Sequence, residues 1–244
     1  MRNEEKNIVK MLNSIKKQNP HFGEIIVVDE ASKDKTKEVV DSYSSRLPIH
    51  VLDGGGNPIG FNRNWGGLLA KGDPLFFSEG NCFLKPDLLK KVEALFQDKD
   101  LAAWSSCSLP YQSSWYVNLT YQLYDVVRFL LWKLHLGFSI SGSVLAIRRE
   151  IFVKLRGFGF FYNDDGVFGR KIFDFCRRSG YKCVFCIDPH YAVVRSMNRF
   201  GGGFCESMNH YIYILTNFLP ALQCLLKNKM IIDETKFEQE EHIT

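Results

Sequence analysis

The chain has 244 residues, 45% of them hydrophobic and 24% charged, which is an ordinary globular composition with enough apolar residues for a sizeable core. Its formal net charge of +4 is too small by itself to indicate nucleic-acid binding, although it is compatible with an anionic ligand or an anionic membrane surface. Seven scattered cysteines and the polar opening MRNEEKN, which lacks a signal-peptide pattern, favour a cytoplasmic protein with reduced thiols over a secreted disulfide framework.

The first hundred residues alternate between helix-like and strand-like segments. Apolar residues at helical spacing predict a first helix over 4–18. Strands are predicted at 24–28, 48–52, 74–78 and 101–104, with helices between them. This alternation is typical of a wound, mostly parallel α/β sheet, whose ligands bind at the carboxyl ends of the strands. Asp29, Asp53 and Glu79 all follow strand-like runs, so we expect them to line such a site.

After residue 106 the pattern changes. Residues 107–140 are rich in aromatic side chains and give no clear periodicity. Further on, the sequence predicts a strand at 142–147, a short helix at 149–155, a helix at 164–179 and a strand at 181–187. The sequence therefore divides into 1–106, 107–200 and a C-terminal segment, 201–244, which we expect to be helical before a polar tail.

Several motifs are spread over most of the chain. They are RNEEKNI (2–8), EIIVVDEASKDKT (24–36), RNWG (63–66), AKGD (70–73), LFFSEGNCFLKPDLL (75–89), GSVLAIRREIF (142–152), GF with NDDGVFGRKI (157–172) and RRSGYK (177–182). In this order they resemble glycosyltransferase family 2, and the resemblance covers residues 2–200. It implies a Rossmann-like GT-A fold, in which a mostly parallel central sheet is flanked by helices. It also implies a nucleotide-sugar donor bound by residues 1–106, an acceptor-binding and catalytic half at 107–200, a divalent metal and an inverting transfer.

One element of that fold is expected to be missing. The family places a hydrophobic strand directly before the Asn-Glu-Glu motif, which here is Asn3, Glu4 and Glu5. This sequence begins at Met1, so we expect either that the true start lies upstream, or that the sequence is a fragment, or that another element takes the place of this strand. Without it, neighbouring strands would lack ladder partners on one side, which is costly when they are buried.

The resemblance also assigns donor contacts residue by residue. The motifs that contact the base and ribose in the family contain five candidate residues here: Asn3, Glu5, Asp29, Ser32 and Asp34. The positions near the diphosphate and sugar are Arg63, Asn64, Arg195 and Arg199. Asp34 has an equal structural interpretation, because an Asp just before a helix can cap it. A surface arginine without a role is the alternative for Arg195 and Arg199, although the guanidinium fork suits phosphate.

Glu79-Gly80-Asn81 stands where the family has its metal-binding Asp-x-Asp motif. Glu79 and Asn81 are two residues apart, so they project to the same side of an extended backbone. The motif would hold Mn²⁺ or Mg²⁺, which prefer oxygen ligands and offset charge on a leaving diphosphate. Asn81 offers only a neutral oxygen, so we expect metal binding to be weaker than in the family at large. An ordinary turn at the strand end is the alternative interpretation.

Asp164 and Asp165 match the family's acidic acceptor motif. The acceptor hydroxyl must lose its proton as it attacks the anomeric carbon, so a carboxylate must lie within hydrogen-bond reach. By this match Asp165 is the catalytic base, and Asp164 assists or orients it. The alternative is that both acids merely stabilise the N-terminus of the helix at 164–179 through its macrodipole.

Two segments suggest contact with a membrane. Residues 207–226 contain no charged side chain but several polar ones, which favours an interfacial or docked helix over a membrane span. Residues 126–138 mix apolar side chains with Arg128, Lys133 and His135 and could also lie on a bilayer, the alternative being a core helix with cations that reach the surface. These features suggest a peripheral enzyme at the cytoplasmic face of a membrane.

The sequence therefore predicts an inverting glycosyltransferase that uses a UDP- or GDP-linked sugar and a glycan or polyprenyl-lipid acceptor, and that does not bind nucleic acid. The altered metal motif and the missing strand leave a second hypothesis open. In that hypothesis the chain is a non-catalytic relative that binds a nucleotide sugar or a glycan. The two hypotheses differ in whether the donor is turned over, and in whether Asp165 matters for the biological role.

Overall fold

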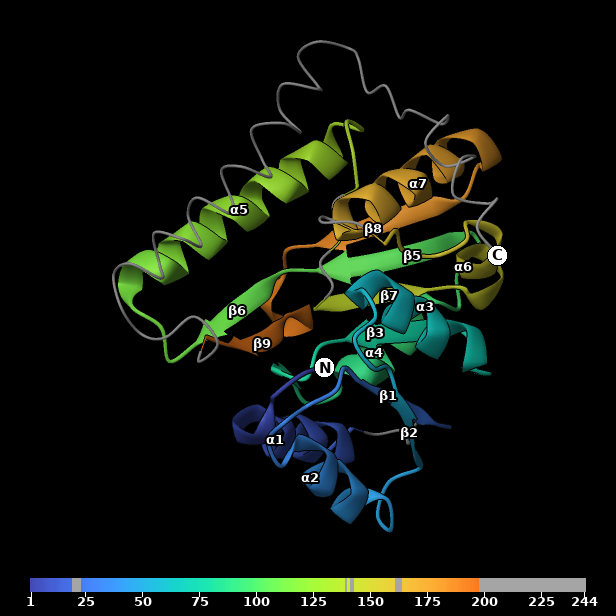
Figure 1. Cartoon of the computed structure of the whole chain (residues 1–244). Coiled ribbons are helices and arrows are strands. Elements are labelled where there is room, and N and C mark those ends of the chain that lie inside the picture. The colour runs from blue at the N-terminus through green and yellow to red at the C-terminus, as the bar shows by residue number, and fades with distance from the viewer. Residues whose placement is uncertain (19–22, 139, 141–142, 161–163, 198–244) are drawn as a thin grey trace. The chain divides into compact units, whose positions relative to one another are not determined.

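The computed structural model describes residues 1–18, 23–138, 140, 143–160 and 164–197. The chain divides into two units, Met1–Gly202 and Gly203–Thr244, and the described residues all belong to the first (Figure 1). The predicted interfacial segment at 207–226, the predicted C-terminal helical region and Arg199 therefore lie outside the described residues. The predicted boundary between 1–106 and 107–200 stays a prediction.

Helices and strands alternate as predicted over the first hundred residues (Figure 1). The helices are α1 (Glu5–Lys16), α2 (Thr36–Tyr43), α3 (Ile59–Leu69), α4 (Leu88–Leu95), α5 (Trp115–Lys133), α6 (Arg149–Lys154) and α7 (Asp164–Ser179), with a short 3-10 helix η1 (Pro189–Tyr191). The strands are β1 (Ile25–Asp29), β2 (Ile49–Asp53), β3 (Leu75–Ser78), β4 (Cys82–Leu84), β5 (Leu101–Ser106), β6 (Ser108–Tyr111), β7 (Val144–Ile147), β8 (Lys182–Cys186) and β9 (Val193–Ser196).

The strands form three sheets, and the predicted α/β class is confirmed. β1 and β2 pair in parallel. The largest sheet has the order β3-β7-β5-β8, in which only β7 runs antiparallel to the others. A third sheet, β4-β9-β6, joins β9 antiparallel to β4 and parallel to β6. Among the described strands β1 and β3 are not paired with each other, so the β1–β2 ladder and the four-stranded sheet are separate.

The four-stranded sheet is buried on both faces. Along β7, Val144 and Ala146 join one apolar cluster while Leu145 and Ile147 join another, as the alternation of side chains on a strand requires. Trp104 on β5 is fully buried and belongs to the first cluster. Burial on both faces explains why β5 and β7 are continuous apolar runs in the sequence rather than alternating ones.

The aromatic-rich region without clear periodicity holds β6 and the long helix α5. Several large apolar side chains of α5 are exposed, at Trp115, Leu119, Leu123, Val126, Leu130 and, just after the helix, Leu134. Two of its charges lie inside, because Arg128 is 3% exposed and its Nη1 donates to Asp125 Oδ1 at 3.0 Å, whereas Lys133 at the end of the helix is exposed. The interpretation of Arg128 as a cation that reaches the surface is therefore wrong. None of the described helices is both long and apolar enough to cross a bilayer.

Candidate active site

An arginine on α3 gathers three carboxylates. Arg63 Nη1 donates to Asp164 Oδ2 at 2.7 Å and to Asp165 Oδ1 at 2.6 Å, and its Nη2 donates to Glu79 Oε1 at 3.0 Å. The Arg63 side chain is 12% exposed, and its guanidinium lies 5.2 Å from the centroid of the Phe158 ring. We call Arg63, Glu79, Asp164, Asp165 and Arg195 the acid–arginine cluster.

Arg195 completes this cluster from the opposite side of Glu79. Its Nη2 donates to Glu79 Oε2 at 2.9 Å, so each oxygen of that carboxylate accepts from a different guanidinium. The β4–β9 pairing brings Arg195 there, because it places Arg195 opposite Cys82, just after the turn that contains Glu79. The Cys82 N–H donates to the Glu79 carbonyl at 3.0 Å and closes that turn.

The positions of the two aspartates follow from the start of α7. Asp164 and Asp165 occupy its first turn, where the helix macrodipole favours negative charge. The backbone N–H of Asp165 donates to Asp164 Oδ1 at 2.9 Å. The position predicted for both acids at a helix N-terminus is therefore confirmed, and the structure places both on Arg63. The catalytic role of Asp165 stays a prediction.

Burial and charge act against each other on the two arginines. Burial by itself would lower the pKa of Arg63, but the carboxylates of Asp165, Glu79 and Asp164 outweigh it and raise that pKa above its ordinary value. Arg195 shows the same balance, with burial opposed mainly by Glu79, and its pKa is also raised. Both guanidinium groups are therefore charged at neutral pH.

Two glycines let α3 approach the loop before α7. A Cβ on Gly60 would come within 1.8 Å of the Gly159 carbonyl oxygen and 3.2 Å of Asp164 Oδ2, so only glycine allows this contact. Gly157 has a φ of +59° and faces Asn64. The Asn64 side chain fixes the loop from both ends of its amide, since Nδ2 donates to the Phe158 carbonyl and Oδ1 accepts from the Phe158 N–H. Asn64 thus positions the loop and does not join the acid–arginine cluster.

The second predicted metal ligand is also outside the cluster. Asn81 is fully buried, its Nδ2 donates to the Ser196 carbonyl at 3.4 Å, and its Oδ1 lies 3.5 Å from the Cys82 thiol. The oxygens of Glu79 and Asn81 therefore already have hydrogen-bond partners within the fold. Among the described residues no group of three or more His, Cys, Asp or Glu side chains is arranged to hold a metal ion. The sequence pattern missed this because a turn, not an extended strand, separates the two residues.

The predicted base and ribose contacts form a second group near the N-terminus. Asp29 accepts hydrogen bonds from the Ser32 hydroxyl at 2.6 Å and the Ser32 N–H at 3.1 Å. Ser32 Oγ in turn accepts from the Asn3 N–H at 3.0 Å. Glu5 Oε2 accepts from the Lys35 N–H at 3.2 Å, and the Glu5 N–H donates to Asp34 Oδ2 at 3.1 Å. All five predicted residues are thus brought together in two interlocked loops.

Asp34 serves the two helices that leave these loops. Its Oδ1 accepts from the Thr36 N–H at 3.0 Å at the start of α2, and its Oδ2 accepts the N–H of Glu5, the first residue of α1. Asp34 therefore binds the N–H of the first residue of each helix, although the N-cap positions themselves are Lys35 and Glu4, and its contact with a donor stays a prediction. The turn at Gly80 packs closely against the N-terminus, because a Cβ on Gly80 would lie 3.1 Å from Glu4 Cγ and 3.2 Å from Met1 Cβ. Gly80 directly follows Glu79, so this contact places the N-terminal group next to the acid–arginine cluster.

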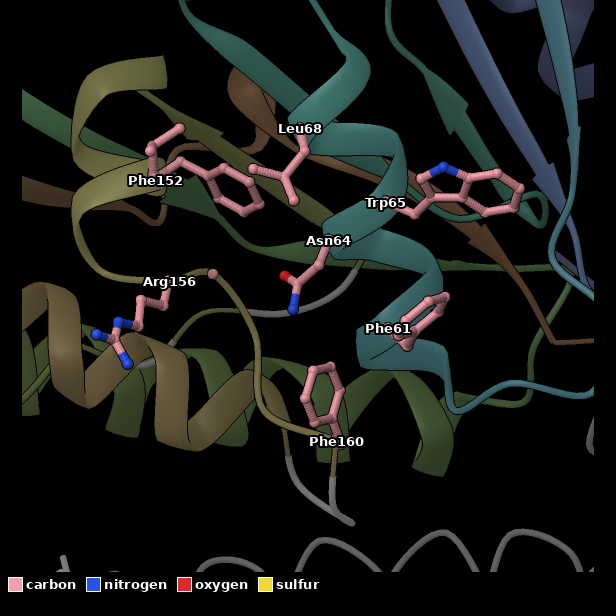
Figure 2. A pocket seen from close by; sticks show the side chains of 9 residues that line it. Phe61, Asn64, Trp65, Leu68, Phe152, Arg156 and Phe160 are labelled. Carbon is pink, nitrogen blue, oxygen red and sulfur yellow. The ribbon is translucent and has the colours of Figure 1, made fainter. Parts of the chain in front are cut away.

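An apolar pocket of about 390 Å³ lies beside the cluster (Figure 2). Its lining is Phe61, Asn64, Trp65, Leu68, Phe152, Val153, Arg156, Gly157 and Phe160. Figure 2 shows Phe61 of α3 and Phe160 of the loop side by side, and their ring centroids are 6.1 Å apart. These two residues directly follow Gly60 and Gly159, so this end of the pocket adjoins Asp164. Sequence reasoning missed the pocket, because an apolar helix face gives the same pattern when it is simply buried.

Tyr121 on α5 is a further residue that sequence reasoning missed. It is 6% exposed, and burial raises its pKa to about 12 although the nearby charge of Arg195 lowers it. Its proximity to Arg195 depends on the course of α5, for which residues 107–140 gave no periodic signal. No sequence pattern pointed to it.

Comparison with known proteins is informative at this point. The model of the family described as glycosyl transferase family 2 matches residues 1–156, which is more than half of the chain. The chain belongs to this family. The glycosyl transferase family 2 relatives include the poly(ribitol-phosphate) beta-N-acetylglucosaminyltransferase TarS of Staphylococcus aureus strain Mu50, 31% identical over 101 residues that cover 39% of this chain and 18% of TarS. The O-antigen chain rhamnosyltransferase WbaN of Salmonella anatum is 23% identical over 193 residues, or 72% of this chain and 58% of WbaN.

Solved structures confirm the GT-A fold. The mannosyltransferase PcManGT from Pyrobaculum calidifontis, determined with GDP-Man and Mn²⁺, matches with a TM-score of 0.68 at 18% identity over 93% of this chain and 66% of that chain. The S. aureus TarS fragment 1–349 with UDP matches with a TM-score of 0.60 at 18% identity, over 81% of this chain and 58% of that one. This chain spans less than two thirds of the length of each of these matched chains.

Proposed function

We propose that this family 2 chain transfers a sugar from a UDP- or GDP-linked donor to an acceptor hydroxyl or phosphate, with inversion at the anomeric carbon. The observation that carries the proposal is the acid–arginine cluster, in which Asp164 and Asp165 meet Arg63 beside Gly60. The nucleotide sugars bound by the solved neighbours, GDP-Man and UDP-GlcNAc, support the donor class. Fold likeness alone would not support it, because one fold hosts many functions.

The proposed reaction is a single displacement. An acceptor oxygen forms a bond to the anomeric carbon as the bond between that carbon and the diphosphate oxygen breaks, and the electron pair leaves with the diphosphate. The acceptor proton passes to an Asp165 oxygen, which must first exchange its hydrogen bond from Arg63 for one from the acceptor. Asp164 orients Asp165 through the 2.9 Å hydrogen bond to its backbone.

A divalent metal is implied by the family, and the solved neighbour PcManGT holds Mn²⁺. The residues of this chain fit such an ion poorly, since the buried Asn81 amide contacts the Ser196 carbonyl and the Cys82 thiol and both Glu79 oxygens accept from arginines. No step of the proposed reaction is therefore assigned to a metal here.

The acceptor part of the proposal is an amphiphile, a polyprenyl-lipid carrier or a lipid-linked glycan. The apolar pocket beside Asp164 supports it, because pockets of 300–1,000 Å³ with mainly aromatic and aliphatic walls suit apolar ligands. The exposed apolar face of α5 supports peripheral contact with a membrane, since large apolar patches mark interaction sites. A cytoplasmic location stays a prediction.

The test is donor turnover by purified chain with UDP- and GDP-sugars and with acceptors of both kinds, water-soluble glycans and short polyprenyl phosphates. We expect Asp165→Asn to lower turnover by about 10²–10⁴-fold while nucleotide affinity is kept, because the base is lost and the donor site is not. The configuration of the product, read by NMR, decides whether the transfer inverts.

Asp174→Asn is the matched control, because Asp174 lies on the same helix and also pairs with an arginine, Arg170, at 2.9 Å. Its turnover should equal that of the unchanged chain. Normal turnover in Asp165→Asn would rule out the base assignment. Nucleotide-sugar binding without any turnover, even of donor hydrolysis, would favour the non-catalytic hypothesis, which the engagement of all three carboxylates by Arg63 also suits.

A further inference from the structure

The carboxylate expected to hold a metal is instead shared by two guanidinium groups. Arg63 Nη2 lies 3.0 Å from Glu79 Oε1, and Arg195 Nη2 lies 2.9 Å from Glu79 Oε2. The side chain of Arg63 is 12% exposed, that of Arg195 is 18% exposed and that of Glu79 is 19% exposed. Solvent therefore screens these contacts only weakly. They come from α3, β9 and the turn after β3, three parts of the chain that are far apart in sequence.

This arrangement disfavours a cation at Glu79. A divalent ion would have to displace at least one guanidinium from the carboxylate and then lie close to two fixed positive charges. The loss of the Arg195 contact would leave a buried charge without compensation, which is strongly unfavourable. Asn81, the other predicted ligand, is turned toward the Ser196 carbonyl.

The same arrangement suits a diphosphate. Arginine presents five N–H donors in a planar fork and binds phosphate oxygens through paired, charge-assisted hydrogen bonds. Arg195 makes one hydrogen bond through Nη2, and its Nε is buried and has no hydrogen-bond partner within the described residues. A buried donor without a partner is costly, so a ligand oxygen that engages this guanidinium would recover that cost.

We propose that Arg63 and Arg195 form a cationic clamp that offsets the charge of the donor's diphosphate, in the place where the family uses a divalent metal. On donor binding each guanidinium keeps its contact with Glu79 and donates further N–H groups of its fork to phosphate oxygens, and the two positive charges match the two negative charges of the diphosphate in a nucleotide sugar. Nucleotide binding therefore does not need Mn²⁺ or Mg²⁺. The inference rests on the proposed function, since it concerns the same donor site.

The first experiment uses the unchanged full chain. UDP, GDP and their sugar conjugates are titrated by calorimetry in EDTA and again in MnCl₂, and the free Mn²⁺ signal is followed by electron paramagnetic resonance with nucleotide-only samples as reference. We expect the dissociation constants to agree within about twofold, and the chain to take up no Mn²⁺ beyond what the nucleotide binds. A tenfold or larger gain in affinity with Mn²⁺, or uptake of one Mn²⁺ per chain, would overturn the clamp and leave the proposed function standing. No nucleotide binding in either buffer would overturn both.

Variants then separate the clamp from a metal site. Arg195→Gln should weaken UDP or GDP binding at least tenfold and leave uridine or guanosine binding unchanged, because only the diphosphate contacts the clamp. Arg195→Lys should restore part of the loss, since it returns the charge without the fork. Glu79→Gln should leave diphosphate binding equal or tighter, because it removes the negative charge of the carboxylate, whereas a metal ligand would give a loss.

Arg170→Gln is the control, because it removes an arginine of α7 that pairs only with Asp174 among the contacts described. Thermal unfolding of each variant shows whether it is folded, and the uridine or guanosine affinity shows whether its donor site is intact. Weaker UDP binding in Glu79→Gln, in a chain that keeps its nucleoside affinity, would contradict the clamp.

Discussion

Arg63 and Arg128 are both buried against carboxylates, and they differ in where those carboxylates lie in the sequence. Arg63 meets Glu79, Asp164 and Asp165, which lie 16, 101 and 102 positions away in the sequence. Arg128 meets Asp125, three positions earlier on the same helix, and stacks on Phe185 at 4.4 Å. The first cluster needs the whole α/β fold to assemble, whereas the second needs little more than one turn of α5 and the strand beneath it.

The difference teaches how to tell a functional cluster from a structural one. The three carboxylates around Arg63 repel one another, so bringing them together is unfavourable for the stability of the fold. A cluster of this kind therefore indicates a function rather than a stabilising role. The Arg128 pair is balanced, at 3% and 7% exposure, and faces aromatic rings rather than a pocket. We therefore expect changes at Arg63 to affect turnover first, and changes at Arg128 to affect stability first.

Arg63→Gln should have the largest effect on activity. It removes one arm of the proposed clamp and leaves the three carboxylates without their shared counter-charge, so we expect kcat/KM to fall by about 10²–10³-fold. Steady-state kinetics of donor turnover measure this, with Arg170→Gln as the control. Arg63→Lys should recover only a small part, since one ammonium group cannot reproduce three directed hydrogen bonds. Turnover of Arg63→Gln within threefold of the unchanged chain would contradict the claim that Arg63, unlike Arg128, serves turnover.

Arg128→Leu should have the largest effect on stability. Removing one partner of a buried pair leaves Asp125 uncompensated, so the free energy of unfolding at pH 7 should fall by about 3–5 kcal/mol, measured by urea unfolding. Burial already raises the pKa of Asp125 against the opposing effect of Arg128. A carboxyl with a raised folded-state pKa is better tolerated when protonated, so the deficit should shrink as the pH falls toward 3.8.

The control for this prediction is the double variant Asp125→Asn with Arg128→Leu, which should recover part of the lost stability because no buried charge remains. Nucleotide affinity should be the same in all of these chains when they are folded. A clear change in affinity in Arg128→Leu would mean that the α5 pair supports the donor site, through neighbours such as Tyr121.

Sequence reasoning located the parts of the fold that have strong local patterns. β1, β3 and β5 are apolar runs between polar turns, and α1 has a clean apolar stripe, so each was predicted within a few residues of its bounds. Only the second half of α5 was anticipated, as part of the segment 126–138, and its first half was not found, because its exposed face is apolar and its buried face carries an ion pair, the reverse of the usual pattern. β4, β6 and β9 have only three or four residues each, too few to show a period.

The candidate site was predictable in membership but not in pairing. Glu79, Asp164, Asp165, Arg63 and Arg195 could all be named from motifs. That Arg195 would meet Glu79 depends on β9 pairing with β4, and that Asn81 would turn away depends on the conformation of one short turn. Such pairings are set by tertiary contacts, which neither composition nor spacing encodes.

Asp34→Ala extends the comparison to a carboxylate whose partners are backbone N–H groups and a hydroxyl instead of an arginine. Because it accepts from the first N–H of α2 and from the first N–H of α1, as a capping side chain would, we expect a loss of about 1 kcal/mol in the free energy of unfolding. Hydrogen bonds from Thr36 and Glu5 outweigh burial and lower the pKa of Asp34 below 3.8. Its contribution is therefore present above pH 3.8 and lost as the pH falls below that value, so the difference between the two chains should vanish in acid. Asp34→Asn keeps one acceptor oxygen and should lose less. If Asp34→Ala kept its stability but lost nucleotide affinity, Asp34 would be a donor contact. Hydrogen bonds from backbone N–H groups would then not be evidence that a carboxylate has a purely structural role.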